Sequence, residues 1–204
     1  MTDAIKIVLA NEVSCADLAA VFGTRGEAAL CRCQRFKTQA RAWDAEPVTP
    51  EMIWARAQRL REQTNCGDPE AGTTSGLVAY FDGEPVGWCA VEPRTAYVRL
   101  QRKPLVWAGR SEDKADAGVW SVPCLITRAG YRKRGVTYAL ARAAIEHARE
   151  RGARAVEGYP MIPKHGQDIT WGELHVGNRT VFAAAGFVEV SHPTPLRVVM
   201  RIDF

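Results

Sequence analysis

The chain has 204 residues, of which 47% are hydrophobic and 25% charged, as in an ordinary globular protein that buries one sizeable core. Its net charge of +4 is weak and spread along the chain, so the composition argues against a nucleic-acid partner. No apolar run approaches the length of a membrane span, and the first residues lack a basic stretch followed by an apolar one. We therefore expect neither a membrane segment nor a secretory signal.

The six cysteines are interpreted as reduced thiols of a cytoplasmic protein, because no secretory signal accompanies them. Cys31-Arg32-Cys33 does not have the spacing of a zinc-binding pair, and no second pair follows it. In an extended segment both thiols would face the same side and could simply pack. No metal site is expected.

The expected elements alternate between strands and helices. Ser14 followed by Asp17, and Thr49 followed by Pro50, are start signals of helices. Two β-rich runs joined by Asp82-Gly83 are typical of a hairpin. In chain order we expect a strand at 6–10, helices at 14–22 and 49–66, hairpin strands at 77–81 and 86–91, a strand at 119–126, a helix at 136–151, a strand at 155–159, a helix at 176–185, and strands at 188–190 and 197–202. This order indicates a single mixed sheet with helices on its faces.

The turn Arg132-Lys133-Arg134-Gly135 lies between the strand 119–126 and the helix 136–151. Such a turn directs main-chain N–H groups outward, its glycine lets a ligand approach the main chain, and the helix N-terminus adds positive potential. Together these features favour a bound phosphate group. A solvated basic turn without a ligand is the alternative.

The order of elements, together with Arg132-x-x-Gly135-x-Thr137, resembles the GNAT acyltransferase superfamily, whose members use acetyl-CoA or a related acyl-CoA. Phe182-Ala183-Ala184-Ala185-Gly186-Phe187 is similar to the aromatic-x-x-x-Gly-Phe ending of the family's fourth helix. The match covers roughly residues 77–204, and we expect a single GNAT-like domain over residues 1–204. The implied fold is α/β (α+β), with a mixed, mostly antiparallel central sheet that is flanked by helices and splayed between its fourth and fifth strands.

The resemblance implies a binding site for coenzyme A. Main-chain amides of the basic turn would hold the pyrophosphate, and the pantetheine arm would hydrogen-bond the freed edge of the strand that ends at Thr127. The residues expected to contact acyl-CoA are Leu125, Ile126, Thr127, Arg132, Lys133, Arg134, Gly135, Val136, Thr137, Asn178 and Phe182.

Two positions depart from the family pattern. Thr137 stands where glycine or alanine is usual, although its hydroxyl can still cap the helix or contact a phosphate oxygen. Phe182 stands where many members have a tyrosine that protonates the leaving thiolate, and phenylalanine has no O–H group. The strand 119–126 also lacks the acidic residue that some members use as a general base. The acid–base groups must therefore be sought elsewhere.

Five side chains are candidates for this chemistry. His175 is the first, because it precedes the last helix and an imidazole titrates near neutral pH. Glu173 could orient His175 or bind a cationic substrate, and Glu92 and Glu157 are further carboxylates that could meet the acyl group. Tyr159 could supply the phenolic proton that position 182 cannot. Each also has a structural alternative: a surface histidine, solvated carboxylates or a buried aromatic ring.

The leading hypothesis is an N-acyltransferase that moves an acetyl or other short acyl group from acyl-CoA to a primary amine by direct attack in a ternary complex. The alternative is a catalytically weak or inactive acyl-CoA-binding sensor or assembly module. A nucleotide-binding protein of another fold is a third possibility, but Gly130 and Gly135 alone form neither a dinucleotide fingerprint nor a P-loop. The acceptor has no readable code in the sequence, and a homodimer is possible.

Overall fold

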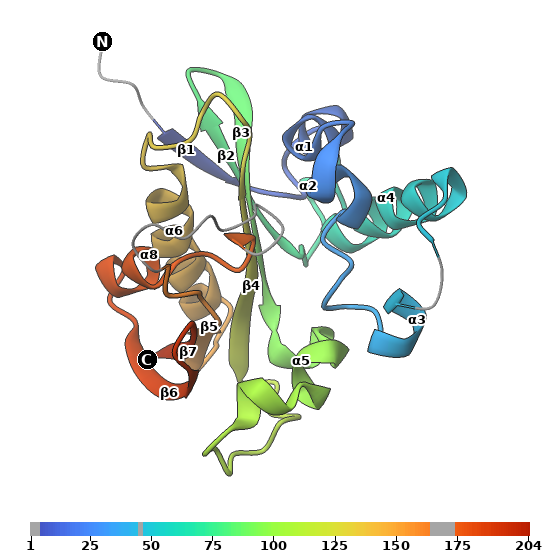
Figure 1. Ribbon diagram of the computed structural model, residues 1–204. Helices are drawn as coiled ribbons and strands as arrows, with labels where there is room; N and C mark the ends of the chain where they lie inside the picture. The colour runs from blue at the N-terminus through green and yellow to red at the C-terminus, as the bar shows by residue number, and fades with distance from the viewer. Residues whose placement is uncertain (1–4, 45–46, 164–173) are drawn as a thin grey trace.

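The computed structural model describes residues 5–44, 47–163 and 174–204. The strands, in chain order, are β1 (Ile5–Leu9), β2 (Gly76–Phe81), β3 (Glu84–Pro93), β4 (Val119–Thr127), β5 (Ala155–Gly158), β6 (Val188–Thr194) and β7 (Arg197–Asp203). They form one seven-stranded sheet in the order β1-β2-β3-β4-β5-β7-β6 (Figure 1). Every neighbouring pair is antiparallel except β4 and β5, which are parallel. The mixed, mostly antiparallel sheet predicted above is confirmed.

Helices cover both faces of the sheet. The α-helices are α1 (Cys15–Phe22), α2 (Gly26–Cys31), α3 (Ala40–Asp44), α4 (Pro50–Thr64), α5 (Val98–Arg102), α6 (Val136–Glu150) and α8 (Arg179–Ala184), and two 3₁₀ turns are η1 (Arg94–Ala96) and η2 (Pro104–Trp107). Figure 1 shows α6 and α8 on one side of β4 and the helices α1 to α4 on the other. Two hydrophobic clusters follow this division, one under α6 and one under α1 and α2.

The predicted start signals begin helices for the expected reasons. The hydroxyl of Ser14 accepts a hydrogen bond from the Asp17 N–H at 3.0 Å, and Thr49 caps α4 in the same way through the Met52 N–H at 3.3 Å. The side chain of Asn178 caps α8 by accepting the Thr180 N–H at 2.7 Å. Each cap satisfies main-chain donors that have no partner within the helix.

The cysteines differ from expectation in two respects. Cys31 ends α2, and the next two residues adopt left-handed backbone conformations, with φ of 47° at Arg32 and 58° at Cys33. The segment is therefore not extended, and its two thiols do not share one face of a strand. Cys15 and Cys66 form a disulfide between the start of α1 and the residues that follow α4. The prediction of uniformly reduced thiols is wrong for this pair.

Strand β4 changes partners along its length. It pairs with β3 up to Thr127 but with β5 only over Val119–Val122. A register shift against β3 inserts an extra residue between Ser121 and Cys124, and Pro123 in this bulge has no N–H to donate. The ladder between β4 and β5 ends at this point, so the second half of β4 is left without a strand on that side.

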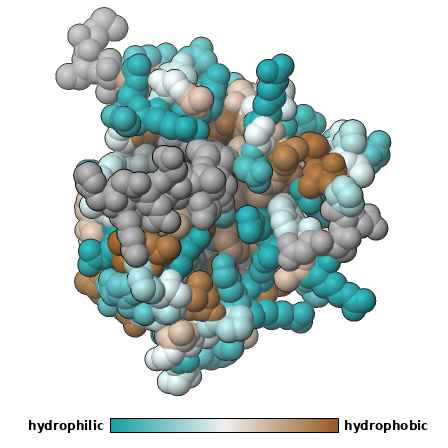
Figure 2. Space-filling model, viewed as in Figure 1, coloured by the Kyte–Doolittle hydropathy of each residue, from teal (hydrophilic) through white to brown (hydrophobic). Residues whose placement is uncertain are grey.

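The molecular face shown in Figure 2 is predominantly hydrophilic, with hydrophobic side chains in separate small areas. Among the described helices, none is both long enough and apolar enough to cross a lipid bilayer.

Candidate functional site

The basic turn leads directly into α6. Lys133 and Gly135 have positive φ of 64° and 82°, and Gly135 is the residue that caps the helix. A Cβ on Gly135 would meet only a side-chain atom of Ile5 at 3.9 Å, so glycine is favoured here by backbone conformation rather than by space. The first N–H groups of this 15-residue helix lack intrahelical acceptors and face the turn, as an anion site requires.

The three basic side chains of the turn have different positions. Arg132 and Lys133 are exposed and line a cavity of about 310 Å³. The guanidinium of Arg134 instead lies over the ring of Phe81, 5.0 Å from its centre, and near that of Tyr131. Two of the three predicted cationic side chains can therefore meet a phosphate in this cavity.

We call this space the turn cavity. It extends from the basic turn to the unpaired half of β4 and to the start of α8. Its lining residues are Leu125, Thr127, Tyr131, Arg132, Lys133, Gly135, Val136, Thr137, Tyr138, Leu174, Gly177, Asn178 and Val181. It thus brings together most of the residues expected to contact acyl-CoA.

Three of those expected residues lie elsewhere. Arg134 packs on aromatic rings, as described above, and Ile126 points to the opposite face of β4. Phe182 is fully buried beneath the turn cavity, with its ring perpendicular to that of Phe187 at 5.0 Å. A Cβ on Gly158 would overlap the Phe182 ring, so this ring fills the space where β5 parts from β4.

Along the free half of β4, one main-chain N–H has a hydrogen-bond partner and one buried side-chain hydroxyl has none among the described residues. The Leu125 N–H donates to the His175 carbonyl at 2.7 Å, so the segment before α8 bridges the gap at this point. The hydroxyl oxygen of Thr127 is buried and has no hydrogen-bond partner among the described residues. A buried hydroxyl without a partner is costly, and a polar ligand in the turn cavity would satisfy it.

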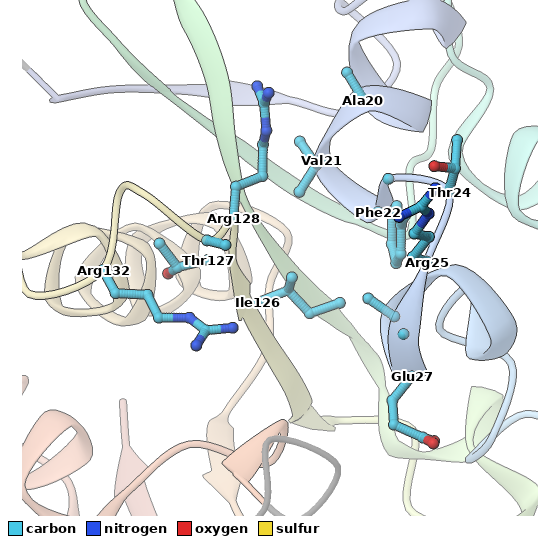
Figure 3. A pocket seen from close by; sticks show the side chains of 14 residues that line it. Ala20, Val21, Phe22, Thr24, Arg25, Glu27, Ile126, Thr127, Arg128 and Arg132 are labelled. Carbon is cyan, nitrogen blue, oxygen red and sulfur yellow. The ribbon is translucent and has the colours of Figure 1, made fainter.

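A second cavity, of about 620 Å³, lies on the other side of β4 (Figure 3). We call it the α1–α2 cavity, because the turn from α1 to α2 forms one wall and the end of β4 forms the other. Thr127 and Arg132 line both this cavity and the turn cavity. The two spaces therefore share these two lining residues at the end of β4.

A third, smaller cavity of about 60 Å³ adjoins the α1–α2 cavity, with which it shares Glu27, Ala28 and Ile126. His175 lines it together with Cys124 of β4. The imidazole packs 5.8 Å from the ring of Phe36. Of the predicted catalytic residues, His175 is thus placed beside the free half of β4.

The other candidates have different surroundings. Glu173 lies outside the described residues. Glu92 forms an ion pair with Lys37, and burial raises the pKa of its carboxyl while Lys37 opposes that rise. Neither the turn cavity nor the α1–α2 cavity is lined by Glu92.

Glu157 is the centre of a buried ion network. Its carboxylate has no exposed surface and pairs with Arg94, Arg110 and Arg201. Tyr159 donates to this carboxylate at 3.1 Å and shares a 2.8 Å hydrogen bond with Ser121. Burial, followed by the charge of Glu157, raises the pKa of the Tyr159 phenol well above its ordinary value. These contacts hold the side chains of Glu157 and Tyr159 in the protein interior.

The thiols near β4 are also held in the interior. Cys33 and Cys124 are buried hydrogen-bond partners, and their interaction and burial raise the pKa of the Cys124 thiol well above its ordinary value. Burial, with a smaller contribution from Cys33, raises the pKa of Cys31 to about 11. The same hydrogen bond from Cys124 instead lowers the pKa of the buried Cys33 thiol. The raised pKa values of Cys31 and Cys124 make these two thiols poor nucleophiles, and their burial favours a packing role.

The sequence interpretation missed Thr24 and Arg25 of the α1–α2 turn and Glu27 in the first turn of α2, which line the second cavity. The available signal was Gly23 and Gly26, which break the helical pattern and both adopt positive φ. A turn set by two glycines between two short helices is a recognisable loop, but its position against β4 is not encoded locally.

Comparisons with known proteins agree with this architecture. The model of the acetyltransferase (GNAT) family matches residues 36–159. No curated protein matches the sequence.

Solved structures provide further matches. One described as an acetyltransferase is 16% identical, with a TM-score of 0.56 over 97% of this chain and 98% of the other. The aminoglycoside acetyltransferase AAC(6')-Ib in complex with coenzyme A is 17% identical, with a TM-score of 0.53 over 98% and 95%. The ribosomal-protein-alanine N-acetyltransferase from Brucella melitensis is 17% identical, with a TM-score of 0.52 over 98% and 99%. At such identities the likeness shows a common fold, whereas the family match spans more than half of the chain. The chain therefore belongs to the GNAT acetyltransferase family.

Proposed function

We propose that the protein transfers an acetyl or other short acyl group from acyl-CoA to a primary amine by direct attack in a ternary complex. One observation carries the proposal: the turn cavity and the α1–α2 cavity lie on opposite faces of β4 and share Thr127 and Arg132 as lining residues. Donor and acceptor could enter from separate sides and come together at the free end of this strand. Such positioning converts a bimolecular step into an effectively unimolecular one.

The donor would bind in the turn cavity. Arg132, Lys133 and the first N–H groups of α6 would hold its diphosphate, since cationic side chains and a helix N-terminus both attract phosphate. The buried hydroxyl of Thr127 would gain the hydrogen bond that it lacks. The thioester supplies the activated acyl group.

The pantetheine arm of the donor would compete with the protein's own main chain for hydrogen bonds to β4. The Leu125 N–H is taken by the His175 carbonyl, so an arm bonding to the full free edge of β4 must displace that carbonyl. Thr127 is the first position along the edge that needs no such displacement. We therefore expect binding to begin at the basic turn and to extend along β4 as residues 174–177 move aside.

The proton of the attacking amine needs an acceptor. In this proposal His175 is the general base, because its imidazole lines the small cavity that adjoins the α1–α2 cavity. Phe182 has no hydroxyl, and the Tyr159 hydroxyl is already hydrogen-bonded to Ser121 and Glu157, so neither residue is expected to protonate the thiolate. The departing thiolate would accordingly be protonated by imidazolium or by water.

A second candidate function is acyl-CoA binding without turnover. The hydroxyl-free Phe182 favours it, as does the His175 carbonyl, which covers the Leu125 N–H. Both candidates require the turn cavity to bind acyl-CoA. They differ only in whether an amine is acylated.

Binding is tested first, by thermal unfolding and calorimetry with acetyl-CoA, with ATP and NAD as controls. Acetyl-CoA should raise the melting temperature, and Arg132→Glu should weaken its affinity by about tenfold to a hundredfold with little change in unfolding free energy. Arg142→Glu makes the same charge change at an exposed position of α6 outside the turn cavity and should leave affinity unchanged. Equal effects of the two variants would contradict the placement of the diphosphate.

Turnover is tested next, by mass spectrometry of acylated products across a panel of amines. His175→Gln should lower kcat by about a hundredfold or more while acetyl-CoA still binds. Acetyl-CoA binding without any acylated product would favour the second candidate.

A further inference from the structure

The α1–α2 cavity has an unbalanced charge. Arg25 and Arg132 lie on its opposite walls, and neither has a hydrogen bond or ion pair among the described residues (Figure 3). Arg128 lines the same cavity, but its guanidinium donates to the Pro85 carbonyl at 2.7 Å and forms an ion pair with Glu84 at 3.8 Å. The wall opposite β4 therefore presents one guanidinium, Arg25, that pairs with none of the residues the structure describes.

We infer that the acceptor is a small amine that also carries a carboxylate or similar anionic group, and that Arg25 binds this anion. The inference rests on the proposed function, because it assigns the substrate class of the same site. A guanidinium forms strong, bidentate hydrogen bonds with a carboxylate. Arg132 lines both cavities, so bound donor phosphates can take up its charge, whereas Arg25 remains available to the acceptor.

The main chain beside Arg25 is anchored to the preceding helix. It lies between Gly23 and Gly26, whose positive φ angles of 68° and 79° shape the turn. The guanidinium of Arg32 donates to the Gly23 carbonyl at 2.9 Å and to the Ala19 carbonyl at 3.5 Å, so it fastens this turn to the end of α1. A fixed turn reduces the entropy lost when a ligand is bound.

The remaining walls of the α1–α2 cavity suit the side chain and the ammonium group of an amino acid. Phe22, Val21 and Ile126 form an apolar surface that suits a hydrocarbon side chain. Glu27 lines both the α1–α2 cavity and the small cavity that contains His175, so it can attract the ammonium group toward the proposed base. The volume of about 620 Å³ lies within the range of small-molecule sites.

The same charges disfavour polycations. A polyamine or aminoglycoside would place several ammonium groups near Arg25 and Arg132, and Glu27 is the one carboxylate among the described lining residues that could offset them. Like charges in one cavity oppose binding. The acceptor class is therefore set by the anion as much as by the amine.

The test uses three matched acceptors: L-phenylalanine, its carboxamide and phenethylamine. Each has the same ring and a primary amine, but only the first has a carboxylate. With acetyl-CoA, kcat/KM should be about tenfold to a hundredfold higher for the acid than for the amide. Arg25→Gln should remove this preference, and Arg142→Gln, an exposed change on α6, should retain it.

Two further measurements separate this inference from the proposed function. Calorimetry of the acid and the amide with the CoA-saturated protein reports anion recognition without turnover. Arg25-dependent preference for the acid, with no product formed, would overturn the transferase proposal and leave the recognition of the anion by Arg25 supported. Equal use or binding of acid and amide, or an unchanged preference in Arg25→Gln, would overturn the inference while leaving acyl transfer intact.

Discussion

Replacing Glu157 by glutamine should destabilise the fold and leave acyl transfer by the folded protein nearly unchanged. The carboxylate is fully buried, and its partners Arg94 and Arg110 have side chains that are 0% and 3% exposed. Arg201 completes the set at 3.2 Å. Glu157→Gln keeps the shape of the side chain but removes the charge that compensates these arginines.

The expected cost follows from the burial of the arginines. Removing one partner of a buried ion pair typically costs about 3–5 kcal/mol, because the remaining charge stays desolvated. Here the lower end applies, since Glu112 also contacts Arg94, Arg110 and Arg201 and offsets part of their charge. We expect a loss of about 3 kcal/mol, which corresponds to a drop in Tm of about 6–12 °C for a chain of this size.

Urea unfolding and thermal melts measure the loss, and kcat is then determined at a temperature where the variant is fully folded. Glu146→Gln is the matched control, because it breaks an exposed pair with Arg149 on α6 and should cost at most about 0.5 kcal/mol. A Glu157→Gln variant that keeps its stability but loses kcat by a hundredfold would refute the structural role and restore this carboxylate as a catalytic base.

Two further predictions concern the interior. Burial, assisted by Arg151, lowers the pKa of His147 to about 4, so between pH 6.5 and 4 the unfolded chain binds a proton that the folded chain does not. Stability should fall as pH drops through this window, by about 1–2 kcal/mol at pH 5, and His147→Leu should lose that part of the slope in urea titrations at several pH values. A Cβ on Gly158 would overlap the Phe182 ring, so Gly158→Ala should cost about 1–3 kcal/mol. The double variant with Phe182→Leu should recover part of this loss, and strict additivity in the double-mutant cycle would contradict the contact.

Local signals were sufficient for most of the fold. The hydroxyl caps at Ser14 and Thr49 begin α1 and α4 as predicted, because a cap acts on main-chain groups two or three residues away. The basic turn and its glycine predict the start of α6 for the same reason. Interactions within a few residues are readable because sequence distance and spatial distance nearly coincide.

The site itself was only partly predictable. The turn cavity collects residues from β4, the basic turn and the start of α8, and most of them are residues that the family resemblance implied. The α1–α2 cavity depends on how a turn near residue 25 packs against residue 126, about a hundred positions later in the chain. The hydrogen bond from Leu125 to the His175 carbonyl is equally non-local. No periodicity or motif reports such pairings.

The carboxylate candidates illustrate this limit most clearly. Strand alternation correctly predicts that Glu157 shares a face with Tyr159, and their side chains are hydrogen-bonded. That pattern cannot reveal the counter-ions, because Arg94, Arg110 and Arg201 lie 63, 47 and 44 positions away in sequence. A carboxylate becomes a base or an ion-pair centre according to whether cations surround it, since neighbouring charge decides which protonation state is favoured. The chemistry of a buried acid is therefore a property of tertiary structure. Glu157→Gln tests the buried ion network, whereas Arg25→Gln tests the proposed acceptor site.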